Sequence, residues 1–300
     1  MRTVSTTVVW MALCMSATGT ASADDRTFDR QVAAEPKGIV DISNVAGSIE
    51  VSGWDRNEVS VHGELGDGVE RVDMISQPGH TSIKVVLPNT PGRHRGGDAD
   101  LKVQIPQGSE LDVSAVSADV RAKNVQGAQR LQSVSGEVSA ELAGADVEIK
   151  NVSGDITLQG HGQPAGVHVS TVSGDVRIEH AAGDLEVSTV SGEVKGSLAG
   201  AHSLRARSTS GDVTFVGKLT RNVTVDVESV SGELTLKAAA DGGYAYELTS
   251  FSGDIDNCFG VQAQRSSQYG PGSSLRGTRG DGSGHVHMRS MSGELMLCDK

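Results

Sequence analysis

A six-residue phrase returns about every 20 residues and constrains the fold more than any other feature of this chain. Each strong copy carries Ser-Gly followed by an acidic residue and then an apolar one. The strong copies are SVSGEV (133–138), NVSGDI (151–156), TVSGDV (171–176), TVSGEV (189–194), STSGDV (208–213), SVSGEL (229–234), SFSGDI (250–255) and SMSGEL (290–295), and weaker ones are AVSADV (115–120) and NVAGSI (44–49). Such self-similarity is typical of stacked supersecondary units.

The spacing of the phrase selects among repeat architectures. From Gly136 to Gly253 the steps between phrase glycines are 18, 20, 18, 19, 21 and 21 residues. Helical repeats need roughly 33 residues or more, and the L-x-x-L-x-L pattern of leucine-rich repeats is missing. Apolar residues alternate with polar ones instead, as in 184–198, which is typical of strands. The sequence therefore predicts an all-β fold, a single-chain, β-helix-like β-solenoid of about 18–21 residues per coil.

Each position of the phrase receives a structural role in this interpretation. We expect the apolar residues two before and two after the glycine, such as Val172 and Val176, to point inward as ladders. The glycine allows a tight corner at positive φ, and the serine before it can hydrogen-bond to the turn. Thr209 departs from the pattern at an apolar position.

An acidic residue follows the glycine in every strong copy. Stacking would place these carboxylates in a column about 5 Å apart. One interpretation is a ladder that binds divalent cations; the other is a solvated structural corner whose carboxylates accept turn N–H groups and discourage edge pairing. The column comprises Glu137, Asp155, Asp175, Glu193, Asp212, Glu233, Asp254 and Glu294.

Residues 1–23 indicate export. Arg2 precedes an apolar run and the segment ends in Ala-Ser-Ala, which together predict a cleaved secretory signal peptide. No other apolar stretch is long enough to span a membrane, so we expect no transmembrane segment in the mature chain. The expected location is the periplasm, the cell surface or the exterior.

Two cysteines remain after the signal peptide, and each stands five residues after a phrase glycine. Equal register places Cys258 and Cys298 at equal positions on their coils, within disulfide range if the coils are adjacent. Export favours oxidation, so we predict a disulfide that closes a loop of roughly 40 residues. Residues 260–284, rich in Gly and Ser, would then form a long loop rather than another coil.

The segment 24–110 lacks the strong phrase and is punctuated by prolines. We interpret it as irregular β coils that cap the N-terminal end of the solenoid, with a separate small β domain as the alternative. Residues 111–298 carry the repeats.

Composition and motifs favour a non-catalytic protein. The net charge of −12 argues against nucleic acid as a partner. No nucleophile elbow or H-E-x-x-H motif is present, so we expect no enzyme, no cofactor and no metal site. His285 and His287 share one strand face with metal-ligand spacing, but the sequence offers no evident third ligand.

The opening GIVDISNVAGSIEVSGW and the serial VSGDV and VSGEV coils resemble the bacterial putative-adhesin family of exported β-strand-repeat proteins, a domain of unknown function. The resemblance covers about 38–297 and implies a β-solenoid of the cell envelope. Three functions are consistent with it: an adhesin or binding module for an envelope or extracellular macromolecule, a periplasmic structural or envelope-stress accessory protein, and, more remotely, a polysaccharide-active β-helix enzyme.

Overall fold

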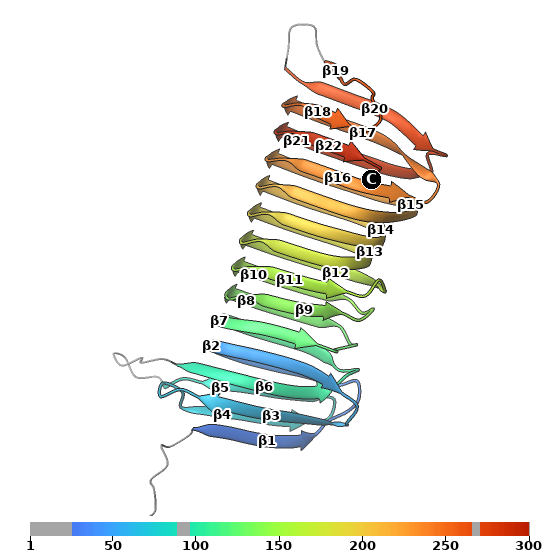
Figure 1. Ribbon diagram of the computed structural model, residues 1–300. Helices are drawn as coiled ribbons and strands as arrows, with labels where there is room; N and C mark the ends of the chain where they lie inside the picture. The colour runs from blue at the N-terminus through green and yellow to red at the C-terminus, as the bar shows by residue number, and fades with distance from the viewer. Residues whose placement is uncertain (1–25, 89–96, 266–270, 300) are drawn as a thin grey trace, which may run out of the picture.

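The computed structural model describes residues 26–88, 97–265 and 271–299, and these residues form an all-β, solenoid-like stack of strands (Figure 1). The predicted signal peptide lies outside the described residues. The strands are β1 (Thr27–Ala33), β2 (Ile39–Trp54), β3 (Glu58–Leu65), β4 (Arg71–Gln77), β5 (His80–Val86), β6 (Asp98–Pro106), β7 (Glu110–Lys123), β8 (Gln129–Ser135), β9 (Val138–Leu142), β10 (Val147–Ser153) and β11 (Ile156–Gly160). They continue as β12 (Pro164–Ser173), β13 (Val176–Ser191), β14 (Val194–Ser210), β15 (Val213–Ser231), β16 (Leu234–Ala240), β17 (Gly243–Ser252), β18 (Ile255–Asn257), β19 (Gln264–Arg265), β20 (Ser273–Gly280), β21 (Gly284–Ser292) and β22 (Leu295–Cys298).

Each middle coil has two strand segments joined at the phrase. The segment before the corner pairs in parallel with its equivalents above and below, as β8 does with β10, and the segment after it does the same, as β9 does with β11. In register, Leu131 lies beside Ile149 and Val138 beside Ile156. The inward side chains of both segments form one apolar core, because a single coil cannot bury them alone.

The expectation for the apolar position two after the glycine is confirmed. All eight side chains are buried, with at most 7% of their surface exposed. They are Val138, Ile156, Val176, Val194, Val213, Leu234, Ile255 and Leu295.

The expectation for the position two before the glycine is wrong. These side chains point outward, and Val172 and Val190 are 46% and 48% exposed. Strict alternation explains the outcome: Leu185 and Val187 point inward, so Thr189 does too, and Val190 faces solvent. The buried Thr189 hydroxyl donates to the carbonyl oxygen of Ser191 at 3.1 Å, so the corner hydrogen bond comes from the residue three before the glycine.

The phrase glycines take the predicted positive φ, for example 120° at Gly154. A Cβ on Gly154 would overlap the carbonyl oxygen of Gly136 one coil below, so the corners stack backbone on backbone. Glycine is required here by both conformation and space.

The N-terminal end departs from chain order. β2 pairs in parallel with β7 on one side and with β5 and β6 on the other. The regular parallel pairing of the coils therefore already includes β2, which lies in the segment 24–110 that the sequence indicated to be irregular. Beyond β5 and β6 the pairing turns antiparallel through β4, β3 and β1.

The C-terminal end departs from chain order more strongly. β21 pairs with β15 on one side and β17 on the other, so the last coil made by the chain is inserted between two earlier ones (Figure 1). β20 then lies antiparallel against β17 at the end of the stack. Residues 260–284 are an excursion out of the coils as expected, but they include β19 and β20 and are not loop throughout.

Candidate functional site

The exposed apolar residues of the phrase line up along one corner of the stack. We call this set the apolar column, and its members are 46–60% exposed. In stacking order it comprises Val116, Val134, Val152, Val172, Val190, Val230, Met291 and Phe251, with Thr209 between Val190 and Val230. Contiguous apolar surface of this kind is typical of interaction sites rather than of a solvated corner.

The upper half of the apolar column lies in a groove of about 680 Å³. Val172, Val190, Val230, Met291 and Phe251 line it, together with the buried hydroxyl side chains three residues before the phrase glycines, such as Thr171 and Thr189. Charged side chains form its edge: Arg207, Glu228 and Arg289. The groove can therefore take an apolar stripe bordered by polar groups.

The acidic column occupies the same corner, and three of its aspartates accept hydrogen bonds from the neighbouring coil. The backbone N–H of Asp175 donates to the Asp155 carboxylate at 2.9 Å, and that of Glu193 donates to Asp175 at 2.9 Å. The Asp212 carboxylate accepts a hydrogen bond from the backbone N–H of Glu233 at 2.8 Å. In the weak copy at 115–120, the Asp119 carboxylate accepts one from the backbone N–H of Glu137. Among the described residues, the column does not form a three-ligand group.

Glu294, at the C-terminal end of the acidic column, is less well accommodated. Partial desolvation, followed by repulsion from Glu233 and Asp256, raises the pKa of Glu294 above its usual value. Glu294 follows Glu233 directly in the stack because β22 lies beside β16.

A row of charged side chains, which sequence reasoning missed, runs along the outer face of the segments that precede the corner. We call it the charged row, and its members oppose one another strand by strand. It comprises Asp41, Asp112, Arg130, Glu148, His168, Glu186, Arg205, Asp226, His287, Glu247 and Arg276. All but Arg276 stand six residues before a phrase glycine or its equivalent, so tabulating that position would have revealed the row.

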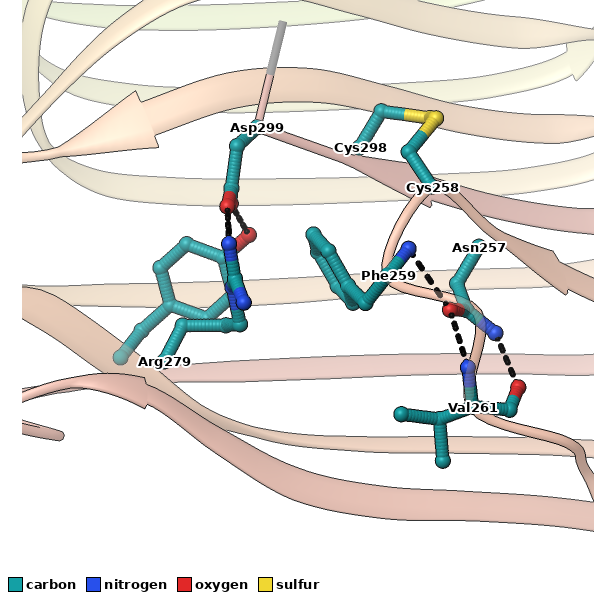
Figure 2. Close-up of a disulfide and its surroundings, with 8 residues drawn as sticks. Asn257, Cys258, Phe259, Val261, Arg279, Cys298 and Asp299 are labelled. Atoms are coloured by element: carbon teal, nitrogen blue, oxygen red, sulfur yellow. Dashed lines mark hydrogen bonds and ion pairs between the residues drawn. A yellow bond between two sulfur atoms is a disulfide. The ribbon is translucent and has the colours of Figure 1, made fainter.

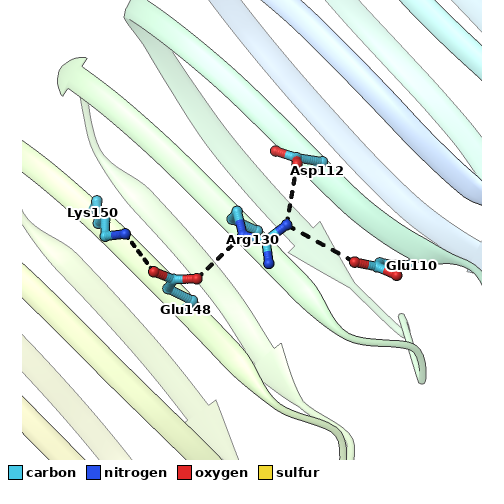
Figure 3. Close-up of polar contacts among 5 residues, drawn as sticks. All are labelled: Glu110, Asp112, Arg130, Glu148 and Lys150. Atoms are coloured by element: carbon cyan, nitrogen blue, oxygen red, sulfur yellow. Dashed lines mark hydrogen bonds and ion pairs between the residues drawn. The ribbon is translucent and has the colours of Figure 1, made fainter.

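Alternating charge holds the row together. Arg130 contacts Glu148 at 3.2 Å and Asp112 at 3.4 Å, and Lys150 also contacts Glu148 (Figure 3). Lys150 and Arg130 hold the pKa of Glu148 below its usual value. Asp41 faces Asp112 instead of a cation, so burial and this carboxylate raise the pKa of Asp41.

A second groove, of about 870 Å³, follows the charged row from Arg130 to Arg205 and also reaches Glu110. Its lining carries both signs of charge, including Arg130, Glu148 and Glu186. Carboxylates outnumber arginines in this lining, so the groove is more negative than positive, although Arg130 pairs with Glu110 and Glu148.

Cys258 and Cys298 form a disulfide between adjacent coils, with their Cα atoms 4.9 Å apart (Figure 2). Their equal register is the one the sequence indicated, since β18 lies beside β22. The sequence did not reveal the order of the two coils: the coil of Cys298 lies between the coil of β16 and the coil of Cys258.

Beside the disulfide, Asp299 joins two side chains. It accepts a hydrogen bond from the Tyr244 hydroxyl at 2.6 Å and two from Arg279, at 2.9 and 2.6 Å. Arg279 also stacks 4.4 Å from the ring centre of Phe259 (Figure 2). Burial and the Asp299 carboxylate raise the pKa of Tyr244, so the tyrosine is a neutral donor that fixes the end of the inserted coil.

The two histidines singled out from the sequence have different surroundings. His287 Nδ1 lies 3.1 Å from an oxygen of Asp226, and Glu228 lies beside both. Among the described residues this trio is the one group of three whose ligand atoms all lie within 4.8 Å of one another. His285 opposes Thr224 and Ala245, which supply no comparable ligand.

The fold and its surfaces define an all-β, solenoid-like repeat protein that presents an apolar column, an acidic column and a charged row. Within 26–88, 97–265 and 271–299 we find no helix of the length and hydrophobicity needed to cross a membrane. The chain belongs to the Toastrack family, DUF4097, whose model matches residues 48–243 and 179–297. This confirms the family resemblance drawn from the sequence.

Solved structures show weak similarity. One is a putative cell adhesion protein from Clostridium sporogenes, with 9% identity, 92% of this chain and 100% of that chain covered, and a TM-score of 0.28. Another is a putative lipid binding protein from Parabacteroides distasonis, with 11% identity, 91% and 98% covered, and a TM-score of 0.31. Both TM-scores are too low to carry an argument about this chain. No curated protein matches it.

Proposed function

We propose that the chain is an exported, non-catalytic binding module of the cell envelope that docks an envelope or extracellular macromolecule along its apolar column. The module is a single β-solenoid of about 18–21 residues per coil, with residues 24–110 as the N-terminal cap and 111–298 as the repeat array. The rival reading, a periplasmic structural or envelope-stress accessory protein, uses the same fold without display on the surface.

The observation that carries the proposal is the exposure of the apolar column. Folding requires the buried residue two after the glycine, but it does not require an apolar side chain two before it, as Thr209 demonstrates. Even so, all the remaining coils from Val134 to Phe251 place an apolar residue at this position. A binding surface accounts for this repetition, since isolated exposed apolar residues are ordinary but aligned ones are not.

The chemistry of the corner favours one kind of partner. The apolar column and the acidic column share one corner, and the acidic residues of the middle copies, such as Asp175 and Glu193, are exposed or partly exposed. A complementary partner therefore presents an apolar stripe with basic groups on the side that meets the acidic column. An amphipathic helix meets this description, because its turns of 5.4 Å nearly match the roughly 4.8 Å rise between coils.

Binding is tested with a synthetic amphipathic helix that carries a leucine stripe flanked by lysines, measured by fluorescence anisotropy. The variant replaces Val172, Val190 and Val230 with Thr, the residue already present at position 209. We expect an affinity at least about tenfold weaker than that of the native protein. The matched control replaces Val216, which is 44% exposed but lies off the column, with Thr. No binding, or equal loss in variant and control, would refute the docking surface.

Location is tested separately by inserting an epitope after Gly260, where an added Cβ would meet nothing within 4 Å. Protease cleavage of the epitope on intact cells supports surface display. Protection until the outer membrane is permeabilised would instead support the periplasmic role. Export itself is refuted if the epitope stays in the cytoplasmic fraction.

A further inference from the structure

We propose that Asp226, Glu228 and His287 form a binding site for a divalent transition metal of the Zn²⁺ type, which clamps the inserted coil to the coil below it. Asp226 and Glu228 are two residues apart on β15, so they project from the same face. His287 lies directly opposite Asp226 on β21. The three ligand atoms lie within 4.8 Å of one another.

The donor set suits this class of ion. Zn²⁺ takes imidazole nitrogen and carboxylate oxygen at about 2.0–2.2 Å, and three protein ligands leave a fourth position for water. Imidazole also favours a transition metal over Ca²⁺ or Mg²⁺, which prefer an all-oxygen shell. The side chains of Asp226 and His287 are 29% and 42% exposed, so an ion and its water can reach the site.

Neighbouring charges set the affinity. His287 has carboxylates on both sides, Asp226 on β15 and Glu247 on β17, while Arg276 pairs with Glu247. Three arginines oppose a cation: Arg205 faces Asp226, Arg289 faces Glu228, and Arg207 lies 3.6 Å from a Glu228 oxygen. Arg207 is therefore the direct competitor for a metal ligand, and metal binding must loosen this ion pair.

The charged row provides its own comparison. His168 occupies the position equivalent to His287, between Glu148 and Glu186, and its Nδ1 lies 3.4 Å from Glu186. What it lacks is a second carboxylate on the strand of Glu186, because Ser188 stands where Glu228 follows Asp226. Glu148, on its other side, is already paired with Arg130 and Lys150. The two sites differ in this second carboxylate and lie on the same face, so His168 is a matched control.

The position of the site gives it a structural consequence. His287 and Asp226 are 61 residues apart in the chain and belong to coils that meet only because β21 is inserted. The disulfide fastens the inserted coil to the outer coil, β22 to β18. A metal ion would fasten the same coil to β15, on its other side.

Metal binding is measured by isothermal titration of Zn²⁺ into the metal-free, untagged mature protein, with melting temperature as a second readout. We expect one equivalent to bind with micromolar affinity or better and to raise the melting temperature. His287→Gln and Glu228→Gln should each weaken binding at least about tenfold and abolish the rise, whereas His168→Gln leaves both unchanged. Arg207→Ala should tighten binding, which a merely structural role of the trio would not produce.

Three results would overturn the site. These are no saturable binding by the native protein, equal losses in the His168→Gln and His287→Gln variants, and weaker binding in Arg207→Ala. Circular dichroism of each variant without metal establishes that it is folded. Glu228 and Arg207 lie at the edge of the groove that holds the apolar column, but Zn²⁺ binding is measured without a docking partner, so its outcome does not depend on docking along that column.

Discussion

The middle coils and the C-terminal end are built from the same phrase but assembled in different ways. From β8 to β15 each coil rests on the one made just before it, and the paired residues are 17–21 positions apart. At the C-terminal end, β21 enters between β15 and β17, so its partners lie about 60 and 40 positions away. Longer loops cost more entropy to close.

The comparison teaches that a repeat can stabilise itself locally, while an end that closes out of order needs further fastening. In the middle, apolar rungs and glycine corners suffice. At the C-terminal end, the disulfide and the contacts of Asp299 with Tyr244 and Arg279 are added. The N-terminal end also inserts a strand, β2, but closes it with antiparallel strands and a buried apolar core that includes Ile83 and Leu101.

The largest expected effect comes from charging the core of the middle coils. Val194 is 1% exposed, so Val194→Asp buries an unpaired carboxylate and should destabilise the protein by about 4 kcal/mol or more. Val190→Asp, four residues earlier but 48% exposed, should cost about 1 kcal/mol or less. Urea denaturation of both variants measures the difference. Similar losses would mean that the two ladders of the phrase do not face opposite ways.

Removing the disulfide tests the C-terminal end alone. With Cys258 and Cys298 both replaced by Ser, the 40-residue separation predicts a loss of about 4 kcal/mol in the chain-entropy model. Hydrogen exchange should show weaker protection in β17–β22 and little change in β8–β14. Reduction of the native protein is the control and should reproduce the pattern. Weakening that extends evenly into the middle coils would contradict the separation of the two regions.

The smallest expected effects are changes in stability from two substitutions in the acidic column, one destabilising and one stabilising. Asp175→Ala removes the acceptor of the Glu193 N–H and should cost roughly 0.5–1 kcal/mol. Glu294→Gln should instead raise the melting temperature at pH 7, because the raised pKa of Glu294 shows that the fold disfavours its charge.

The pH dependence gives the second prediction its check. When folding raises the pKa of a carboxyl, the protein loses stability as the pH rises from the unfolded pKa of that group, about 4.3, through its folded pKa. The gain from Glu294→Gln should therefore vanish below about pH 4, where the native side chain is protonated in both states. A gain that persists there would point to packing rather than charge.

Much of the fold was predictable because the phrase fixes the register. The spacing of the glycines indicated the coil, and the equal offsets of Cys258 and Cys298 indicated adjacent coils. The direction of Val190 was predicted wrongly because the apolar residues were grouped by type, whereas counting in twos from Val187 gives the correct face. The pairing of the two cysteines also does not predict which of their coils lies nearer to the middle of the stack.

The candidate metal site could be predicted only in part. His287 stood out in the sequence, but its partners Asp226 and Glu228 are about 60 residues away and become neighbours through the insertion of β21. A regular continuation of the stack would have placed β17 against β15 instead. Because all coils carry nearly the same phrase, any two of them could pair, so the repeat does not predict the order in which the coils stack.

The inserted coil has a consequence for how the molecule is made. The chain synthesises β17 before β21, and until β21 exists the edge of β15 is open to a strand that carries the same phrase. In the finished fold that edge is taken by β21 and not by β17, so the place beside β15 is filled only after the last coil has been made. The array follows chain order along most of its length and is completed by insertion.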